Sequence, residues 1–90
     1  MAGSSNDKKH FKAVVYVSFK DGVLDPQGST IQRALGTLGY NGIADVRAGK
    51  FFEIALAAHD ERAARTEIEA ICQKLLANPV IEKYRYEVRS

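Results

Sequence analysis

Residues 51–75, FFEIALAAHDERAARTEIEAICQKL, change from the periodicity of a strand to that of a helix across one short connection. In residues 51–58 large apolar side chains occupy alternate positions, namely Phe52, Ile54 and Leu56. Asp60 then stands where a helix N-cap is expected, because its carboxylate can accept from the first free N–H groups. The apolar stripe of this helix consists of Ala64, Ile68, Ile71, Cys72 and Leu75. We therefore expect a strand followed directly by an amphipathic helix.

An earlier strand and helix precede this unit. Residues 12–19 (KAVVYVSF) are rich in valine and predict a strand. In Asp25-Pro26 an N-cap carboxylate is followed by proline, which is favoured at the first helical position. A capping box over residues 29–32 offers a competing start. We prefer the start at Asp25, and we expect Gly39 to close the helix as a left-handed cap.

Two more strands complete the pattern. Residues 43–48 (IADVRA) predict a short strand that forms a hairpin with residues 51–58, because the Gly49-Lys50 link is too short for a crossover. Residues 80–88 (VIEKYRYEV) predict the last strand, after Asn78-Pro79 ends the second helix. The order strand, helix, strand, strand, helix, strand predicts a ferredoxin-like α+β fold, a two-layer sandwich with an antiparallel sheet and both helices on one face.

The composition is that of one small domain from a reducing compartment. The chain has 90 residues and a net charge of +2, which is too small to indicate a nucleic-acid partner. A single cysteine excludes an internal disulfide. The polar N-terminus lacks the apolar run of a signal peptide, and no stretch has the roughly 18–20 apolar residues of a membrane helix. We expect a flexible tail over residues 1–11, one domain over residues 12–90 and a cytoplasmic location.

One face of the predicted sheet is more apolar than contact with solvent requires. In a two-layer sandwich the face opposite the helices meets water and should be polar. Here it would carry Val14, Tyr16, Phe51 and Ala55, on the two strands expected to be central. An apolar patch of this kind is more often an interface than a chance exposure of apolar side chains. We therefore expect these residues to form homo-oligomer contacts, in a dimer or a tetramer.

The sequence offers no convincing set of reactive side chains. His59 precedes Cys72 by 13 residues, which is about 20 Å along a continuous helix, so a thiol–imidazole pair is not expected. Cys72 falls within the apolar stripe, where a buried structural thiol is the simpler interpretation. Asp21 and Asp25 could bind a metal, but turn formation and capping account for both. We expect no catalytic residue and no metal site.

Two binding alternatives are weaker. The helix start at residues 25–30 could hold an anion on its free N–H groups, although it lacks the spacings of phosphate-binding loops. Residues 49–56 (GKFFEIAL) superficially resemble the octamer of RNA-recognition domains. The outward positions after Phe51, however, are Glu53 and Ala55 instead of aromatic residues. We therefore predict binding to neither nucleic acid nor membrane.

Three runs of residues are distinctive: 17–28 (VSFKDGVLDPQG), 46–50 (VRAGK) and 72–82 (CQKLLANPVIE). Together they resemble the PurS family, the small subunits of phosphoribosylformylglycinamidine synthase. The first and last runs are each fairly specific, and their joint occurrence at this separation is more so. The resemblance covers about residues 12–88, which is nearly the whole predicted domain.

The resemblance implies an assembly role in purine biosynthesis. A PurS-like subunit, as a dimer, would bridge a glutaminase subunit and a large synthetase subunit and would help ammonia pass between them. The complex would use ATP, Mg and glutamine to convert formylglycinamide ribonucleotide to formylglycinamidine ribonucleotide. This chain alone would bind no cofactor, and the catalytic residues would belong to the other subunits. The rival interpretation is a ferredoxin-like module that binds a regulatory small molecule.

Two segments are expected to contact the partner subunits, because loops on a rigid scaffold usually carry recognition. Val23 and Leu24 are apolar where a solvent-facing loop would be polar. Alternatively, Leu24 packs under the first helix as a hydrophobic staple. The expected contact residues are Lys20, Gly22, Val23, Leu24, Asp25, Pro26, Gln27, Gly28, Arg47, Gly49 and Lys50.

Overall fold

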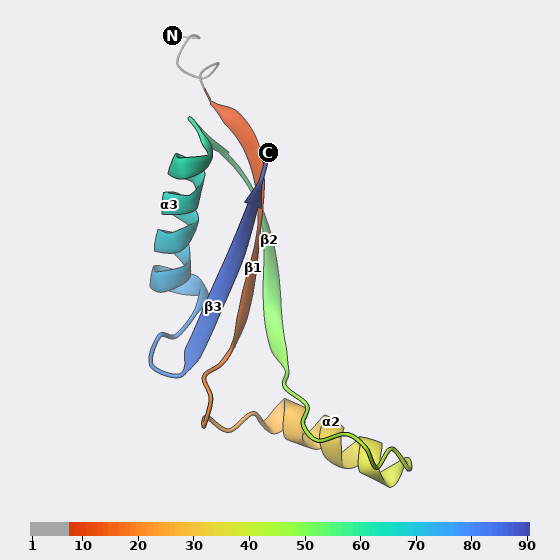
Figure 1. Ribbon diagram of the computed structural model, residues 1–90. Helices are drawn as coiled ribbons and strands as arrows, with labels where there is room; N and C mark the ends of the chain where they lie inside the picture. Colours follow the sequence, from red (N-terminus) through yellow and green to blue (C-terminus); the bar gives the residue numbers. More distant parts are fainter. Residues whose placement is uncertain (1–7) are drawn as a thin grey trace.

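An antiparallel sheet forms the centre of the computed structural model, which describes residues 8–90 (Figure 1). Within those residues the sheet has three strands in the order β2-β1-β3, and they are β1 (Lys9–Phe19), β2 (Gly49–Ala58) and β3 (Glu82–Arg89). Val15 of β1 lies opposite Phe52 of β2 and Tyr86 of β3. The side chains of β1 alternate between the two faces, so that Val15 and Val17 are buried in the core while Val14 and Tyr16 are half-buried on the other face.

The helix α3 (Glu61–Ile71) covers one face of this sheet (Figure 1). The predicted N-cap is confirmed, because the Ala63 N–H donates to the Asp60 carboxylate at 2.8 Å. A π-helical turn, η1 (Cys72–Leu76), continues α3. Three members of the predicted stripe, Ala64, Ile68 and Cys72, have no exposed surface. Leu75 instead is exposed, because the wider π-helical turn moves it out of the stripe.

The first helix, α2 (Pro26–Thr37), points away from one end of the sheet (Figure 1). Its predicted ends are confirmed, since Asp25 is the N-cap and Gly39 has a φ of 99°. Among its residues only Gly28 is buried. The α+β class, the antiparallel sheet and the two helices are therefore confirmed, whereas the expectation that both helices lie on one face of the sheet is wrong. No helix within residues 8–90 has the length and apolar character needed to cross a membrane.

Residues 43–48 pair with no strand in the described part of the chain, so the predicted strand and its hairpin are wrong. The chain does not turn at Gly49. It enters β2 there and pairs with β1 from Ser18 opposite Gly49 to Lys9 opposite Ala58. β3 occupies the other side of β1, so β2 lies at an edge of the sheet and is not a central strand.

The N-terminal boundary expected at residue 12 lies too late. β1 begins at Lys9, and Phe11 is only 6% exposed because it packs in the core. Residues 8–11 of the expected tail are therefore ordered at the start of the domain. The remaining part of that prediction, residues 1–7, lies outside the described residues.

Candidate functional site

The residues expected to contact partner subunits gather where the chain leaves the sheet and returns to it. We call residues 20–48 the arm, which contains α2 and the extended segment that leads back to β2. The two ends of the arm meet, because the Arg47 guanidinium lies 3.1 Å from the Asp21 carboxylate. Lys83 of β3 lies 3.6 Å from the same carboxylate. The structure therefore brings the two predicted segments, residues 20–28 and 47–50, to the same end of the sheet.

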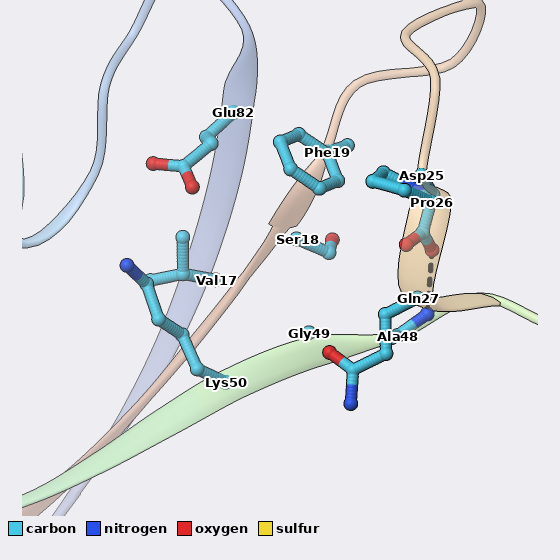
Figure 2. A pocket seen from close by; sticks show the side chains of 10 residues that line it. All are labelled: Val17, Ser18, Phe19, Asp25, Pro26, Gln27, Ala48, Gly49, Lys50 and Glu82. Atoms are coloured by element: carbon cyan, nitrogen blue, oxygen red, sulfur yellow. Dashed lines mark hydrogen bonds between the residues drawn. The ribbon is translucent and has the colours of Figure 1, made fainter. Parts of the chain in front are cut away.

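Asp25 is the one buried polar side chain among the described residues, with 8% of its surface exposed. One carboxylate oxygen accepts from the Gly28 N–H at 3.0 Å, and the other accepts from the Ala48 N–H at 2.7 Å. The second contact is the dashed line in Figure 2. The hydrogen bond from Ala48, followed by that from Gly28, lowers the pKa of Asp25 because both favour the ionised form.

Gly28 allows the two parts of the arm to approach each other closely. A Cβ at this position would lie 2.4 Å from the Val46 carbonyl oxygen and 2.6 Å from Asp25 Oδ2. Both distances are too short for any side chain, so the position requires glycine although its φ is ordinary. The return segment therefore crosses the first turn of α2 in direct contact with its backbone.

A cavity of about 310 Å³ opens beside this crossing (Figure 2). Pro26 and Gln27 line it from the start of α2, Lys50 from β2 and Glu82 from β3. An anion entering here would meet the Asp25 carboxylate, which already accepts from the Gly28 N–H at the helix start. The geometry therefore disfavours the phosphate-binding alternative.

Apolar side chains of the arm are exposed to solvent. Leu24 is 73% exposed, so it does not pack under α2 as a hydrophobic staple. Leu38 of the C-cap and Tyr40 behind it are 72% and 60% exposed. Ile31, Leu35 and Leu38 recur at helical spacing in the sequence, a pattern that indicates an apolar helix face but does not show what covers it. Leu38 and Tyr40 are thus interface candidates that the sequence interpretation missed.

The four residues expected at a homo-oligomer interface do share one face of the sheet. Tyr16 lies opposite Phe51 across β1 and β2, with their ring centroids 6.2 Å apart. Phe51 is 60% exposed, Ala55 is exposed, and Val14 and Tyr16 are half-buried. The Arg85 guanidinium of β3 lies 4.0 Å from the Tyr16 ring centroid and covers part of it. The exposed apolar surface is therefore on the β2 side of this face.

Glu69 of α3 holds together a polar cluster that the sequence interpretation did not identify. Its carboxylate accepts from the Tyr84 hydroxyl, from the Tyr86 hydroxyl at 2.9 Å and from Gln73 Nε2 at 2.8 Å. These three donors, in that order, lower the pKa of Glu69. Their hydrogen bonds to Glu69 raise the pKa of both tyrosines. The cluster fixes α3 on β3, and its groups all satisfy one another.

Cys72 has the surroundings of a structural thiol. It is completely buried, and its burial, followed by the nearby charge of Glu69, raises its pKa. A raised pKa leaves little of the nucleophilic thiolate at neutral pH. His59 is exposed at the other end of α3. Within residues 8–90, no group of three or more histidine, cysteine, aspartate or glutamate side chains could hold a metal ion.

A family profile described as "PurS: Phosphoribosylformylglycinamidine (FGAM) synthase" matches residues 12–90. The chain belongs to the PurS family. It is 51% identical over 78 residues to the phosphoribosylformylglycinamidine synthase subunit PurS of Bacillus subtilis, and the match covers 87% of this chain and 92% of that one. The resemblance seen in the sequence is thereby confirmed.

Solved PurS structures have the same fold. Methanocaldococcus jannaschii PurS superposes with a TM-score of 0.80 at 44% identity, covering 89% of this chain and 96% of that one. A chain in the structure of PurLQS from Thermotoga maritima superposes with a TM-score of 0.82 at 30% identity, covering 89% and 98%. The part of this chain that is not superposed is shorter than the arm, so the superposed part must include residues of the arm. The arm is therefore part of the fold that these PurS chains share.

Proposed function

We propose that this chain is a non-catalytic assembly subunit of phosphoribosylformylglycinamidine synthase, which bridges the glutaminase and synthetase subunits and assists ammonia transfer between them. Membership of the PurS family along residues 12–90 carries this proposal. The Methanocaldococcus jannaschii relative is described as one of the subunits of formylglycinamide ribonucleotide amidotransferase in the purine biosynthetic pathway. The Thermotoga maritima relative comes from a structure of PurLQS.

The side chains of the described residues support a role without chemistry of its own. A nucleophile needs an adjacent base or a lowered pKa, and Cys72 is buried with a raised pKa. The buried carboxylate, Asp25, is occupied by two backbone N–H groups of its own chain. ATP, Mg and glutamine would accordingly be bound by the other subunits, and this chain alone would bind no nucleotide. A single unpaired, buried thiol is compatible with the cytoplasm, where we place the complex.

The arm is the surface that we assign to the partner subunits. It projects beyond the sheet (Figure 1), and it exposes Leu24, Leu38 and Tyr40. Residues 20–28 and 47–50 lie together at its base, where Asp21 pairs with Arg47 and Lys83. An apolar side chain surrounded by charged groups is the usual arrangement of a contact residue within a polar rim.

Assembly of the three chains tests both the role and the surface. The glutaminase and synthetase subunits are mixed with this chain, and complex formation is measured by size-exclusion chromatography with light scattering. We expect a stable three-chain complex, and we expect Leu24→Asp to weaken it by more than about tenfold, as for the loss of one central contact residue. Leu75→Asp is the matched control, because Leu75 is 79% exposed but lies outside the arm on η1.

The assembly role and the assignment of the loop at residues 20–28 to the interface can be disproved independently. If the unsubstituted chain does not join the other two subunits, the assembly role is wrong. If the unsubstituted chain joins them and Leu24→Asp behaves like Leu75→Asp, the role stands and the loop at residues 20–28 lies outside the interface.

The cavity at the base of the arm is the feature that favours the alternative, a regulatory small-molecule site. Its volume of about 310 Å³ is at the lower end of the range of about 300–1,000 Å³ for ligand pockets. That alternative predicts saturable binding of a small molecule by this chain alone, measured by calorimetry, and loss of binding in Lys50→Ala. The assembly role predicts no such binding without the partner subunits.

A further inference from the structure

The arm touches the rest of the molecule at its base. Beyond Gly28 no residue of α2 is buried, so within the described chain neither the sheet nor α3 covers the far end of the helix. A helix of 12 residues is roughly 18 Å long. A rotation of about 20° at the base would therefore move its far end by roughly 6 Å. The direction of the arm depends on the few contacts where its two ends cross.

The Asp25 carboxylate is the strongest of these contacts. It joins the Gly28 N–H at the start of α2 to the Ala48 N–H at the end of the return segment. Those donors are 20 residues apart in the chain, so the carboxylate bridges both ends of the arm with one side chain. Asp25 is buried and its bond to the Ala48 N–H is partly buried, and in such surroundings hydrogen bonds to a charged group are stronger than in water. The lowered pKa keeps Asp25 ionised at neutral pH.

One backbone hydrogen bond, from the Lys20 N–H to the Ile81 carbonyl at 2.9 Å, also holds the start of the arm, but it does not reach the return segment. The remaining contacts are exposed and hold the arm less firmly. Gln32 Nε2 donates to the Ala44 carbonyl at 3.1 Å, in an exposed position. The Arg47–Asp21 ion pair is exposed, with 90% of the Asp21 side chain accessible. Exposed pairs of this kind add little stability. Gly28 contributes by its lack of a side chain, which lets the Val46 carbonyl oxygen approach the helix.

We propose that Asp25 is a positioning residue that fixes the direction of the arm relative to the sheet by bridging Gly28 and Ala48, and that complex assembly depends on this bridge. The inference rests on the proposed assembly function. It explains why an aspartate, rather than any good N-cap residue, stands before Pro26, because a cap needs one acceptor oxygen and the bridge needs two. It also explains the glycine at position 28, where a side chain would collide with the Asp25 carboxylate and the return segment.

Asp25→Asn and Asp25→Ser separate the bridge from the cap. Asparagine and serine are both good N-cap residues, so α2 remains helical by circular dichroism. The asparagine amide presents N–H groups to the Ala48 N–H, and serine is too short and has a single oxygen. We expect hydrogen exchange at the Ala48 amide to become about tenfold faster in both variants, as for the loss of one hydrogen bond to a charged group. Complex assembly should weaken by a similar factor.

Asp60→Asn is the matched control. Asp60 caps α3 through the Ala63 N–H and bridges to no second segment in the described chain. This variant should leave Ala48 exchange and complex assembly unchanged within about twofold, the range of an ordinary surface substitution. A general effect of replacing a capping carboxylate by an amide would instead weaken assembly in both positions.

The outcomes are distinct. Wild-type protection of the Ala48 amide in Asp25→Asn would show that the bridge does not hold the return segment, and fast exchange with unchanged assembly would show that assembly does not depend on it. Either result overturns the proposal. If the unsubstituted chain fails to join the partner subunits, the assembly function and the dependence of assembly on the bridge are both overturned, while exchange at Ala48 still decides whether the bridge exists.

Discussion

Glu69 links the pH dependence of stability to the packing of α3 on β3. Its carboxylate accepts from Tyr84, Tyr86 and Gln73. These donors stabilise the ionised form, so the pKa of Glu69 lies below its ordinary value in the folded chain. The stabilisation is therefore fully present above the unfolded pKa of about 4.3 and is lost as the pH falls through the folded pKa.

Replacing Glu69 by glutamine should remove this dependence. We expect Glu69→Gln to be less stable than the unsubstituted chain at pH 7, because the amide accepts at one oxygen and presents N–H groups to a tyrosine hydroxyl. The difference in the free energy of unfolding should shrink as the pH falls below about 4.3. Urea unfolding over a series of pH values measures it. A difference that stays constant down to the most acid value would show that Glu69 is not the titrating group.

Asp25 and Asp60 show which features of an element the sequence can predict. Both N-caps were recognised from neighbouring residues, and both carboxylates cap as expected. Residues 43–48 resemble a strand equally well, yet they pair with no strand in the part of the chain that is described. Capping depends on atoms a few residues away in the chain. Strand pairing instead depends on which distant segment forms hydrogen bonds with the backbone of β1. The residues expected to contact partners are two separate segments in the sequence, and only the structure shows that Asp25 joins them.

The two helices should contribute unequally to stability, and a matched pair of isoleucines tests this. Ile68 of α3 is completely buried, while Ile31 of α2 is 40% exposed. We expect Ile68→Ala to lower the free energy of unfolding by about 2–5 kcal/mol. Ile31→Ala should lower it by less than about 1 kcal/mol, since little packing is lost. Both are measured by denaturant unfolding of the chain alone at low concentration, and equal losses would mean that α2 packs on the sheet.

The whole molecule is long and thin for its size. Its extents are 62 × 26 × 15 Å and its radius of gyration is 18.2 Å, whereas a compact chain of this length would have a radius of about 12 Å. The thin core under α3 and the projecting arm leave a large surface for contacts with other chains. This shape agrees with a subunit that joins larger proteins.

The exposed face of the sheet gives a prediction about self-association. We expect Phe51→Asp to shift the isolated chain from an oligomer towards the monomer, because the charge would be buried against a second copy at this apolar face. Light scattering over a range of concentrations measures the mass. Leu75→Asp, at a more exposed position on η1, serves as control. An unchanged mass in Phe51→Asp would remove Val14, Tyr16, Phe51 and Ala55 from the oligomer interface.

Glutamine-dependent formation of formylglycinamidine ribonucleotide, measured with and without this chain, is the most direct test of the assembly role. The glutaminase and synthetase subunits are held constant and this chain is added in steps. We predict that product formation rises until a fixed stoichiometric ratio is reached, and that this chain alone consumes neither ATP nor glutamine. The account would be contradicted if the rate of product formation did not change when this chain is added. It would also be contradicted if this chain alone turned over a substrate and one substitution in it abolished that turnover.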